Sequence, residues 1–414
     1  MKPFKYFIYF LVFLVIESKV NAQATTYVPD DNFEQALIDL GYDMILDDYV
    51  LTEDIITITV LDVSSKNIND LTGIEDFTAL ETLHCYSNNL TVLDLSDNII
   101  LVTLDCRFNN LSSLNISNNT ALEWLACSAN NLTNLDVSGN PNLANLFCAQ
   151  NNLSSLDVTN NTALVYMECG NNNLSSLDVS NKTALETLSC GGNNLTNLNV
   201  SNCPILNSIY CEENDLTSLN ISTVPNLFYL SCPQNNLESI DVSSNPSLYY
   251  FFCNQNNITS LDLSANTSLS LLDCSNNRLI SLNVKNGNNQ AINYNFYATN
   301  NPNLTCIQVD DTAWSTTNWS SNIDPQSYFS EDCNLDVNDY NIENLSVFPN
   351  PAQDFFQIET NTAIQEVIIY NSLGKTIAKY HLQEKYDVSN LEKGVFFVSV
   401  KLDNKIINQK IIIN

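Results

Sequence analysis

Hydrophobic positions in most of the chain recur at a fixed spacing, in steps of 21 positions. One leucine column runs from Leu80 to Leu269, and a second, with a few other apolar residues, runs from Leu83 to Leu272. Apolar residues alternate with other residues around Leu83, and the pair Leu93 and Leu95 repeats this alternation. A period of two is typical of a strand. We therefore expect one short strand per unit, paired in parallel with its neighbours, and a second narrow sheet on the opposite wall.

Two further columns keep the same spacing. Cysteine recurs with this step from Cys85 to Cys274, and asparagine does so from Asn88 to Asn277, so that one unit reads LxxLxCxxNNLTxLDVSxNxx. A repeat this regular predicts a solenoid in which each unit packs only on its neighbours. A unit this short leaves no room for a helix on the convex side, which favours a β-rich solenoid with short turns.

This unit resembles that of the leucine-rich-repeat family, LxxLxLxxNxL. The match runs from Leu80 through Leu90, with Cys85 in place of the third leucine, and the repeats cover residues 58 to about 309. The resemblance implies that the asparagine column turns inward and satisfies backbone groups where the chain leaves the strand. Such groups must be paired when they are buried.

The two ends of the array differ from its middle, as capping requires. Residues 30–38 are typical of a short helix with Asp31 or Asn32 as N-cap. We expect a cap over residues 25–57 with this helix covering the first coil, then an irregular coil near residues 61–74. A C-terminal cap over residues 310–335 is expected to close the solenoid of residues 58–309.

Residues 1–24 have the pattern of an export signal. Lys2 and Lys5 precede an apolar run, and Ala22-Gln23-Ala24 offers small residues for cleavage. The alternative is a membrane span, but the run from Tyr6 to Ile16 is shorter than the roughly 20 residues that a span needs. We therefore expect a protein that is secreted or at the cell surface and not integral to a membrane.

A different pattern follows a linker at residues 336–344. Short alternating strands separated by Gly, Asn and Asp predict a small Ig-like β-sandwich over residues 345–414. The segments FPNP, IYNSLGK and DVSNLEKG resemble the type A C-terminal sorting domain of the type IX secretion system of Bacteroidota, although the final Ile413-Asn414 departs from a basic ending. The resemblance implies export by that machinery, removal of the tail by a sortase-like protease, and release or surface attachment. The alternative is an ordinary adhesive Ig-like module.

The charge is strongly negative, at −31 for the whole chain. Residues 25–335 hold 35 acidic and 5 basic side chains. Such a body repels phosphate backbones, which argues against nucleic-acid binding, and it favours cations and basic partners.

The cysteines fall into three groups: the ten of the column, the pair Cys306 and Cys333, and Cys203. The ten column thiols are interpreted as small buried hydrophobes, because stacked Cβ atoms about 4.8 Å apart do not suit disulfides. Metal binding is disfavoured since the chain has no CxxC pairs. Cys306 and Cys333 bracket the segment after the last coil, and we predict a disulfide between them. Cys203 has no obvious mate.

Carboxylates offer one metal candidate. An Asp/Asn column in the second strand includes Asp136, Asp157 and Asp178, and stacked carboxylates are the oxygen ligands that calcium prefers. The alternative is a solvated polar face without an ion. No other cofactor is expected.

An enzyme is not expected. The chain has two histidines, and strand alternation sends His84 and Cys85 to opposite faces. A glycosidase pair of carboxylates remains an alternative, although nothing in the sequence selects one pair.

The variable outward positions of the first strand hold a series of aromatic residues. They form one group with Trp124, Phe147 and Tyr166, and another with Tyr210, Tyr229, Tyr250 and Phe252. Exposed apolar patches mark interaction sites, and aromatic residues are frequent interface anchors. The alternative is that the rings shield neighbouring strands.

The sequence therefore predicts a mainly β protein: a leucine-rich-repeat parallel β-solenoid with a short N-terminal capping helix and a small C-terminal sandwich. We expect a secreted or surface recognition protein that binds a protein ligand on its exposed sheet. A carbohydrate ligand is the alternative, and a glycan-active enzyme or a structural surface-layer role ranks lower.

Overall fold

The computed structural model describes residues 23–333, 345–360, 363–371, 374–402 and 406–414. Nearly all of the expected signal peptide (1–24) and the whole expected linker (336–344) lie outside the described residues. The chain divides into two compact units between Cys333 and Asn334. Within the described parts, no helix is both long enough and apolar enough to cross a membrane.

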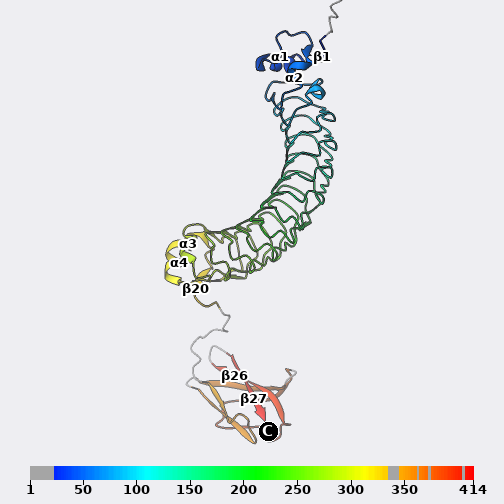
Figure 1. Cartoon of the computed structure of the whole chain (residues 1–414). Coiled ribbons are helices and arrows are strands. Elements are labelled where there is room, and N and C mark those ends of the chain that lie inside the picture. The colour runs from blue at the N-terminus through cyan, green and yellow to red at the C-terminus, as the bar shows by residue number, and fades with distance from the viewer. Residues whose placement is uncertain (1–22, 334–344, 361–362, 372–373, 403–405) are drawn as a thin grey trace, which may run out of the picture. The chain divides into compact units, whose positions relative to one another are not determined.

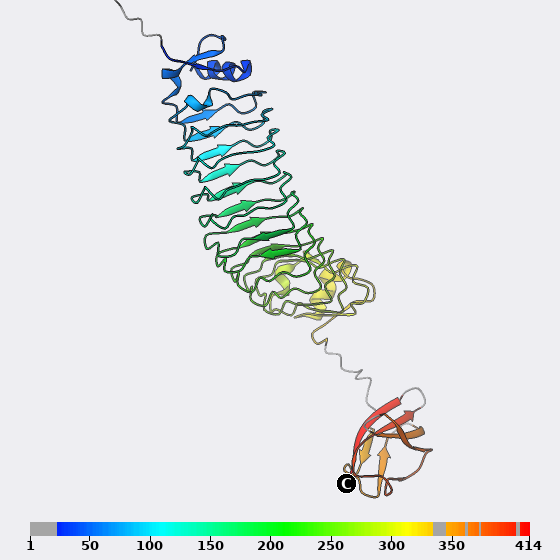
Figure 2. The same ribbon diagram turned by 90° about the vertical axis from the view of Figure 1, so that its right-hand side faces the viewer.

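The first unit is a solenoid whose coils stack into a curved body (Figure 1). Its described residues contain a 12-stranded parallel sheet, the main sheet, to which successive coils contribute one short strand each. Figure 2 shows these strands side by side across the stack. The strands are β3 (Val60–Asp62), β4 (Thr82–His84), β5 (Thr103–Asp105), β6 (Trp124–Ala126), β7 (Asn145–Phe147), β8 (Tyr166–Glu168), β10 (Thr187–Ser189), β12 (Ser208–Tyr210), β13 (Tyr229–Ser231), β14 (Tyr250–Phe252), β16 (Leu271–Asp273) and β18 (Phe296–Tyr297).

The register of the main sheet follows the repeat. Thr82 pairs with Thr103 and Leu83 with Leu104, one repeat further on. The central residue of each three-residue strand is buried, as Leu83 is, and the two flanking residues face outward. The predicted parallel solenoid with one strand per unit is thus confirmed.

The second wall forms strands in part of the stack. Its two sheets contain β9 (Ser176–Asp178) and β11 (Asn197–Asn199), and β15 (Ser260–Asp262), β17 (Ser281–Asn283), β19 (Cys306–Gln308) and β20 (Tyr328–Ser330). Among the described residues, the other regular coils have no strand on this wall.

The core of the solenoid is held by polar as well as apolar columns. Asn130 shows the pattern of the first asparagine column: its Nδ2 donates to the carbonyls of Cys106 at 3.0 Å and Cys127 at 3.1 Å, and its Oδ1 accepts from the N–H of Leu111 at 2.9 Å. Each cysteine carbonyl thereby accepts from two successive asparagines, as Cys106 does from Asn109 and Asn130. The family resemblance implied that this asparagine column turns inward, and the structure confirms it.

A second asparagine column, which the repeat unit contains but to which the sequence analysis assigned no role, stacks near the turn after the second strand. Asn119 is fully buried, and its Nδ2 donates to the carbonyls of Leu95 at 3.0 Å and Asn98 at 2.9 Å in the preceding coil. Unlike the first column, it is interrupted in three coils by Lys182, Cys203 and Val224. The remaining members are Asn98, Asn140, Asn161, Asn245 and Asn266.

The N-terminal cap is built by an antiparallel pair and short helices. It consists of β1 (Thr25–Tyr27), α1 (Asp31–Leu40), β2 (Tyr49–Leu51) and α2 (Thr52–Ile55), and the irregular first coil after it contains the 3₁₀ turn η1 (Ile74–Asp76). The N-cap of α1 is Asp30, whose Oδ1 accepts from the N–H groups of Asn32 and Phe33, so the predicted N-cap at Asp31 or Asn32 was wrong by one or two positions. Asp30 is preferred because its other oxygen also accepts from the N–H of Asn69, which ties the helix to the first coil.

The C-terminal cap closes the other end of the stack. It contains α3 (Asn289–Ile292), α4 (Thr312–Trp319) and the 3₁₀ turn η2 (Ser320–Asn322). Trp319 is fully buried and stacks on Phe296 of β18 with ring centroids 4.3 Å apart. The predicted disulfide between Cys306 and Cys333 is confirmed and ties β19 to the end of the cap.

The second unit is formed by two antiparallel sheets. One contains β21 (Ser346–Phe348), β22 (Phe355–Glu359) and β25 (Tyr386–Asp387), and the other β23 (Ile364–Asn371), β24 (Thr376–Tyr380), β26 (Gly394–Leu402) and β27 (Ile406–Ile413). A separate core that includes Phe356, Val398 and Ile411 is buried here. This arrangement is consistent with the predicted small β-sandwich.

Candidate functional site

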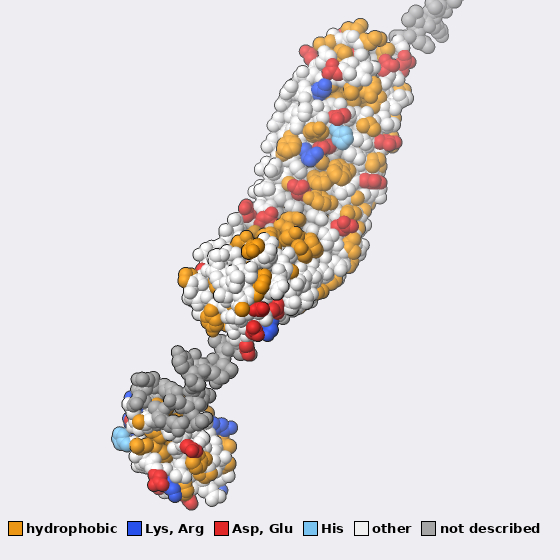
Figure 3. All heavy atoms as spheres, turned by 90° about the vertical axis from the view of Figure 1, so that its left-hand side faces the viewer, with side chains coloured by type: hydrophobic (Ala, Val, Ile, Leu, Met, Phe, Trp, Pro, Cys, Tyr) orange, Lys and Arg blue, Asp and Glu red, His pale blue; other side chains and the backbone are white. Residues whose placement is uncertain are grey.

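The outward face of the main sheet carries most of the predicted binding residues. Figure 3 looks onto the inner side of the solenoid's curve, where hydrophobic side chains gather over the coils. The predicted aromatic residues form two groups, which we call the first aromatic cluster (Trp124, Phe147 and Tyr166) and the second aromatic cluster (Tyr210, Tyr229, Tyr250 and Phe252).

The first aromatic cluster is a continuous row of rings. Trp124 lies 4.8 Å from Phe147 between ring centroids, and Phe147 lies 5.0 Å from Tyr166. The register explains the row, because Phe147 is at the third position of β7 and so lies diagonal to the first positions of β6 and β8. Trp124 is 38% exposed, whereas the other two rings are half-buried.

The second aromatic cluster extends over three strands. Tyr229 is its centre, with ring centroids 4.6 Å from Tyr210 and 5.6 Å from both Tyr250 and Phe252. The structure thus brings the predicted residues together within each cluster. Their contacts with one another also satisfy the shielding interpretation, so the geometry by itself does not assign them to a ligand.

Two further rings belong beside the second cluster and were missed in the sequence. Phe228 and Tyr249 precede β13 and β14, stack with centroids 5.0 Å apart, and both contact Tyr250. Phe228 is 43% exposed. The signal that could have found them is their shared position directly before the strand, one repeat apart.

Burial and neighbouring carboxylates keep two of the phenols protonated. The pKa of Tyr166 is raised by burial, then by Glu168 and Tyr210, and the pKa of Tyr229 is raised by burial, then by Tyr210 and Glu212. Both side chains are therefore neutral hydrogen-bond donors at physiological pH.

The N-terminal part of the same face holds an ion pair. Arg107 donates from Nε to Asp105 Oδ1 at 2.9 Å and from Nη2 to Oδ2 at 2.7 Å. Since Asp105 is nearly buried, the fork fixes both side chains on the surface, where Asp105 pairs with Ala126 of β6.

The column cysteines lie on the inner side of the main sheet and are unreactive in character. All ten are buried and unpaired by disulfides, as is Cys203. Burial, with a smaller effect of Asp105, raises the pKa of Cys127 to about 12. A thiol in this state is neither a nucleophile nor a metal ligand at neutral pH.

The candidate calcium carboxylates serve the turns of the second wall. Oδ1 of Asp136, Asp157 and Asp178 accepts in each case from the backbone N–H two residues further on. Hydrogen bonds from the hydroxyl groups of Ser138, Thr159 and Ser180, together with these backbone N–H groups, lower the pKa of all three carboxyls. Among the described residues, no group of three or more His, Cys, Asp or Glu side chains is placed to hold a metal ion.

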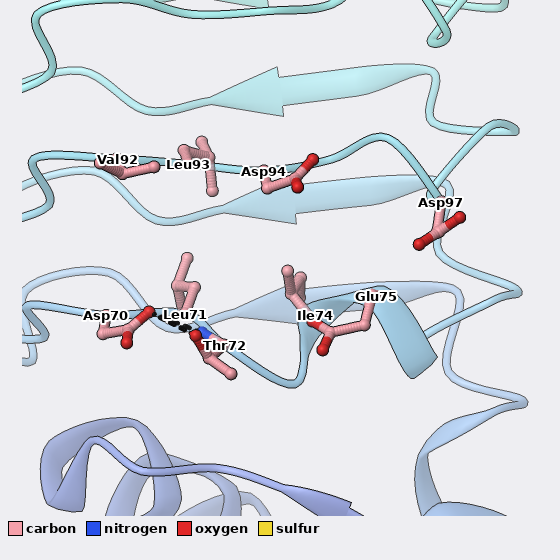
Figure 4. Close-up of a pocket in the computed structure, with 9 residues that line it drawn as sticks. All are labelled: Asp70, Leu71, Thr72, Ile74, Glu75, Val92, Leu93, Asp94 and Asp97. Carbon is pink, nitrogen blue, oxygen red and sulfur yellow. Dashed lines mark hydrogen bonds between the residues drawn. The ribbon is translucent and has the colours of Figure 1, made fainter.

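A small acidic cavity lies between the irregular first coil and the next one. It has a volume of about 300 Å³ and is lined by four carboxylates, Asp70, Glu75, Asp94 and Asp97. Figure 4 shows Asp97 set apart from the others. Asp70 accepts from Thr72, Glu75 from the N–H of Gly73, and Asp94 from the N–H of Ser96, so these groups serve local turns.

Comparison with known proteins adds three findings. The family described as the secretion system C-terminal sorting domain matches residues 346–414. The solved functional domain of InlJ from Listeria monocytogenes, which includes a cysteine ladder, is 34% identical, covers 74% of this chain and 70% of that chain, and has a TM-score of 0.62. The internalin InlF from the same species, at 22% identity and a TM-score of 0.50, shares the fold over 74% of this chain and 96% of its own.

Two curated proteins match shorter stretches. Internalin J of Listeria monocytogenes is 42% identical over 72 residues, which is 17% of this chain and 8% of that protein. The ulvan lyase NLR42 of Nonlabens ulvanivorans is 32% identical over 102 residues, which is 23% of this chain and 19% of that protein. This chain therefore spans less than a fifth of either curated relative.

Proposed function

The chain belongs to the secreted bacterial leucine-rich-repeat proteins and ends in a secretion sorting domain, and from this premise we propose that it is a recognition protein that binds a protein ligand through the outward face of its main sheet. The observation that carries the proposal is the pair of aromatic clusters on that face. The proposal also leads us to expect no catalytic activity.

The clusters have the properties of interface anchors. Large rings contribute much apolar area, lose little rotamer freedom on binding, and dominate the energetics of many interfaces. Packing against neighbouring rings fixes each side chain before a ligand arrives, which lowers the entropy lost on binding. The opposite wall instead repeats short polar residues such as Ser96, Ser117 and Ser138.

We test this proposal with the full chain. It is immobilised and probed with a panel of extracellular-matrix proteins, intact bacterial cells and a glycan array. The variant Trp124→Ser/Tyr229→Ser/Tyr250→Ser is expected to weaken binding of any ligand found by more than tenfold, because each anchor is worth about 1–2 kcal/mol or more.

The matched control removes exposed apolar side chains elsewhere. Val92, Ile99 and Ile280 are 72%, 58% and 64% exposed and lie outside the main sheet. Val92→Ser/Ile99→Ser/Ile280→Ser should leave binding within twofold. Equal binding by the wild type and the cluster variant, with circular dichroism showing both folded, would contradict the proposal.

A carbohydrate ligand is the second candidate. The stacked rings Phe228 and Tyr249 lie nearly parallel, with 10° between their planes, and present flat faces of the kind on which sugar rings stack. Binding on the glycan array that is lost in Phe228→Ser/Tyr249→Ser, without binding to any protein of the panel, would favour this candidate.

For the tail we propose passage through the type IX secretion machinery and cleavage by a sortase-like protease. Removing residues 345–414 in a host that carries this system should leave the solenoid inside the cell envelope. Appearance of the truncated chain in the medium at the wild-type level would contradict this role.

A further inference from the structure

A narrow interruption separates the two aromatic clusters. The intervening strand β10 presents only Thr187 and Ser189 outward. Gly170 and Gly191 follow β8 and β10, where other coils place Arg107, Ser128 or Ala149. We call this interruption the notch and define it by Tyr166, Glu168, Gly170, Gly191, Tyr210 and Glu212.

The register sets the width of the notch. Glu168 pairs with Ser189 and Ser189 with Tyr210, so the walls of the notch stand two strands apart. Neighbouring strands are about 4.8 Å apart, which gives roughly 10 Å between the wall residues. This is room for one extended side chain over small residues.

The two glycines at the base of the notch have close neighbours, which are backbone atoms at Gly170 and the end of the Glu212 side chain at Gly191. A Cβ at Gly170 would lie 2.9 Å from the carbonyl oxygen of Gly191, and a Cβ at Gly191 would lie 2.9 Å from Cδ of Glu212. The carboxyl group of Glu212 therefore lies directly over Gly191. Only a missing side chain lets it occupy that place.

One oxygen of this carboxyl group lacks a donor. Glu212 Oε2 is buried and has no hydrogen-bond partner among the described residues. A carboxylate oxygen without a donor is unfavourable. Because Oε2 itself is covered, a cationic donor entering the notch reaches it only when the flexible Glu212 side chain turns that oxygen outward, and it then gains a strong, charge-assisted hydrogen bond.

The surroundings of the notch are negative. Glu168, Glu186 and Glu213 lie in or next to it, and the ion pairs of the solenoid among the described residues are Lys66 with Asp39 and Arg107 with Asp105. Residues 25–335 hold 35 acidic and 5 basic side chains. The charge of the face is thus complementary to a basic partner and not to an acidic one.

We propose that the notch binds the guanidinium or ammonium group of a basic, extended segment of a partner protein, with the two aromatic clusters holding its apolar residues on either side. This inference rests on the proposed function of the sheet face. Arginine suits the notch best, because its planar group pairs with carboxylates while it stacks on the rings of Tyr166 or Tyr210.

The experiment uses fluorescent hexa-arginine as probe and its hexa-citrulline counterpart, which has the same shape without charge. Binding to the full chain is measured by anisotropy at 20 and 150 mM salt. Hexa-arginine is expected to bind saturably and hexa-citrulline at least tenfold more weakly. Glu212→Gln and Glu168→Gln should each weaken hexa-arginine binding roughly tenfold, the loss of one charge-assisted hydrogen bond.

Matched controls separate the notch from the overall charge. Glu238→Gln removes one negative charge from the second wall, and Gly139→Ala adds a methyl group there; both should leave binding within twofold. Gly191→Ala should weaken binding as Glu212→Gln does, because it displaces the Glu212 carboxyl group.

The inference is overturned by any of three results: no saturable binding of hexa-arginine, equal binding of hexa-citrulline, or an equal loss in Glu238→Gln. These results are distinct from a failure of the proposed function. If the ligand found with the panel is lost in the aromatic variant but is unaffected by Glu212→Gln, the sheet face stands as the recognition surface and the notch does not contribute. If the aromatic variant keeps the ligand, the face itself is wrong.

Discussion

Replacing Asn130 by alanine tests whether the first asparagine column holds neighbouring coils together. The carbonyls of Cys106 and Cys127 would each lose one donor but keep another, from Asn109 and Asn151. The N–H of Leu111, whose acceptor is Asn130 Oδ1, would be left buried without a partner.

The magnitude follows from these contacts. A buried donor left without an acceptor costs about 1–3 kcal/mol, and each weakened carbonyl adds roughly 0.5–1 kcal/mol, so the expected destabilisation is about 2–5 kcal/mol. Asn140 in the second column offers a matched comparison. Its Nδ2 donates to the carbonyls of Ile116 and Asn119, which keep backbone donors, and its Oδ1 has no partner to lose. Asn140→Ala should therefore cost only about 1–2 kcal/mol.

The assay is local because a repeat array need not unfold in one step. Hydrogen exchange followed by mass spectrometry should show faster exchange of the segment around Leu111 in Asn130→Ala. The segment around Asn119 should change much less in Asn140→Ala. Unchanged exchange at Leu111, or equal effects of the two substitutions, would refute the argument that the number of orphaned backbone groups decides the cost.

Three further outcomes are expected. Burial raises the pKa of Cys127 and Cys169 from about 9 to about 12. Above pH 9 thiols therefore ionise in the unfolded chain and not in the folded one, so urea midpoints should be nearly constant between about pH 6 and 8 and fall between pH 9 and 12; a midpoint that rises there would contradict this. Cys333→Ser should expose the C-terminal cap to proteolysis, because a disulfide contributes about 2–4 kcal/mol to stability. An unchanged rate of proteolytic cleavage would contradict a stabilising role of this disulfide. A calcium chelator should shift the melting temperature by less than about 1 °C, because Asp157 already accepts a turn hydrogen bond. A marked increase of the melting temperature when millimolar calcium is added would restore calcium as a candidate ligand.

The repeat made much of the fold predictable. A residue that recurs once in every unit must occupy the same place in every coil, so the period of two around Leu83 was enough to assign the strand, its parallel partner and its buried side. The same logic put Cys85 inside and His84 outside. At the two ends of the solenoid, the local sequence was less sufficient to predict the structure. Three consecutive residues, Asp30, Asp31 and Asn32, all suit an N-cap, and only the tertiary contact with Asn69 selects the first.

The second asparagine column shows where sequence reasoning stopped short. Asn98 and Asn119 have the same spacing as the first column, but spacing alone did not show which carbonyls they bind. Leu93 and Leu95 are buried, as their alternation predicts, yet only some coils form ladder hydrogen bonds on that wall, and a single unit does not show which.

The sequence predicted which aromatic residues of the strands face outward, but not their contacts with one another or the two neighbouring rings Phe228 and Tyr249. Column positions identified Trp124 and Tyr229 as outward residues, but the contacts between rings depend on diagonal neighbours in the sheet. The relation between Gly191 and Glu212 depends on a close approach in space that spacing along the chain does not reveal.

The two caps have a consequence for assembly. A stack of identical coils exposes at each end a strand with unsatisfied backbone groups and an open apolar cross-section, onto which the end of another molecule fits as the next coil would. The N-terminal helices share one core with β3, and Trp319 seals the opposite end against Phe296. The caps thereby prevent end-to-end association of solenoids. A solenoid that lacks either cap would be prone to assemble end to end into filaments.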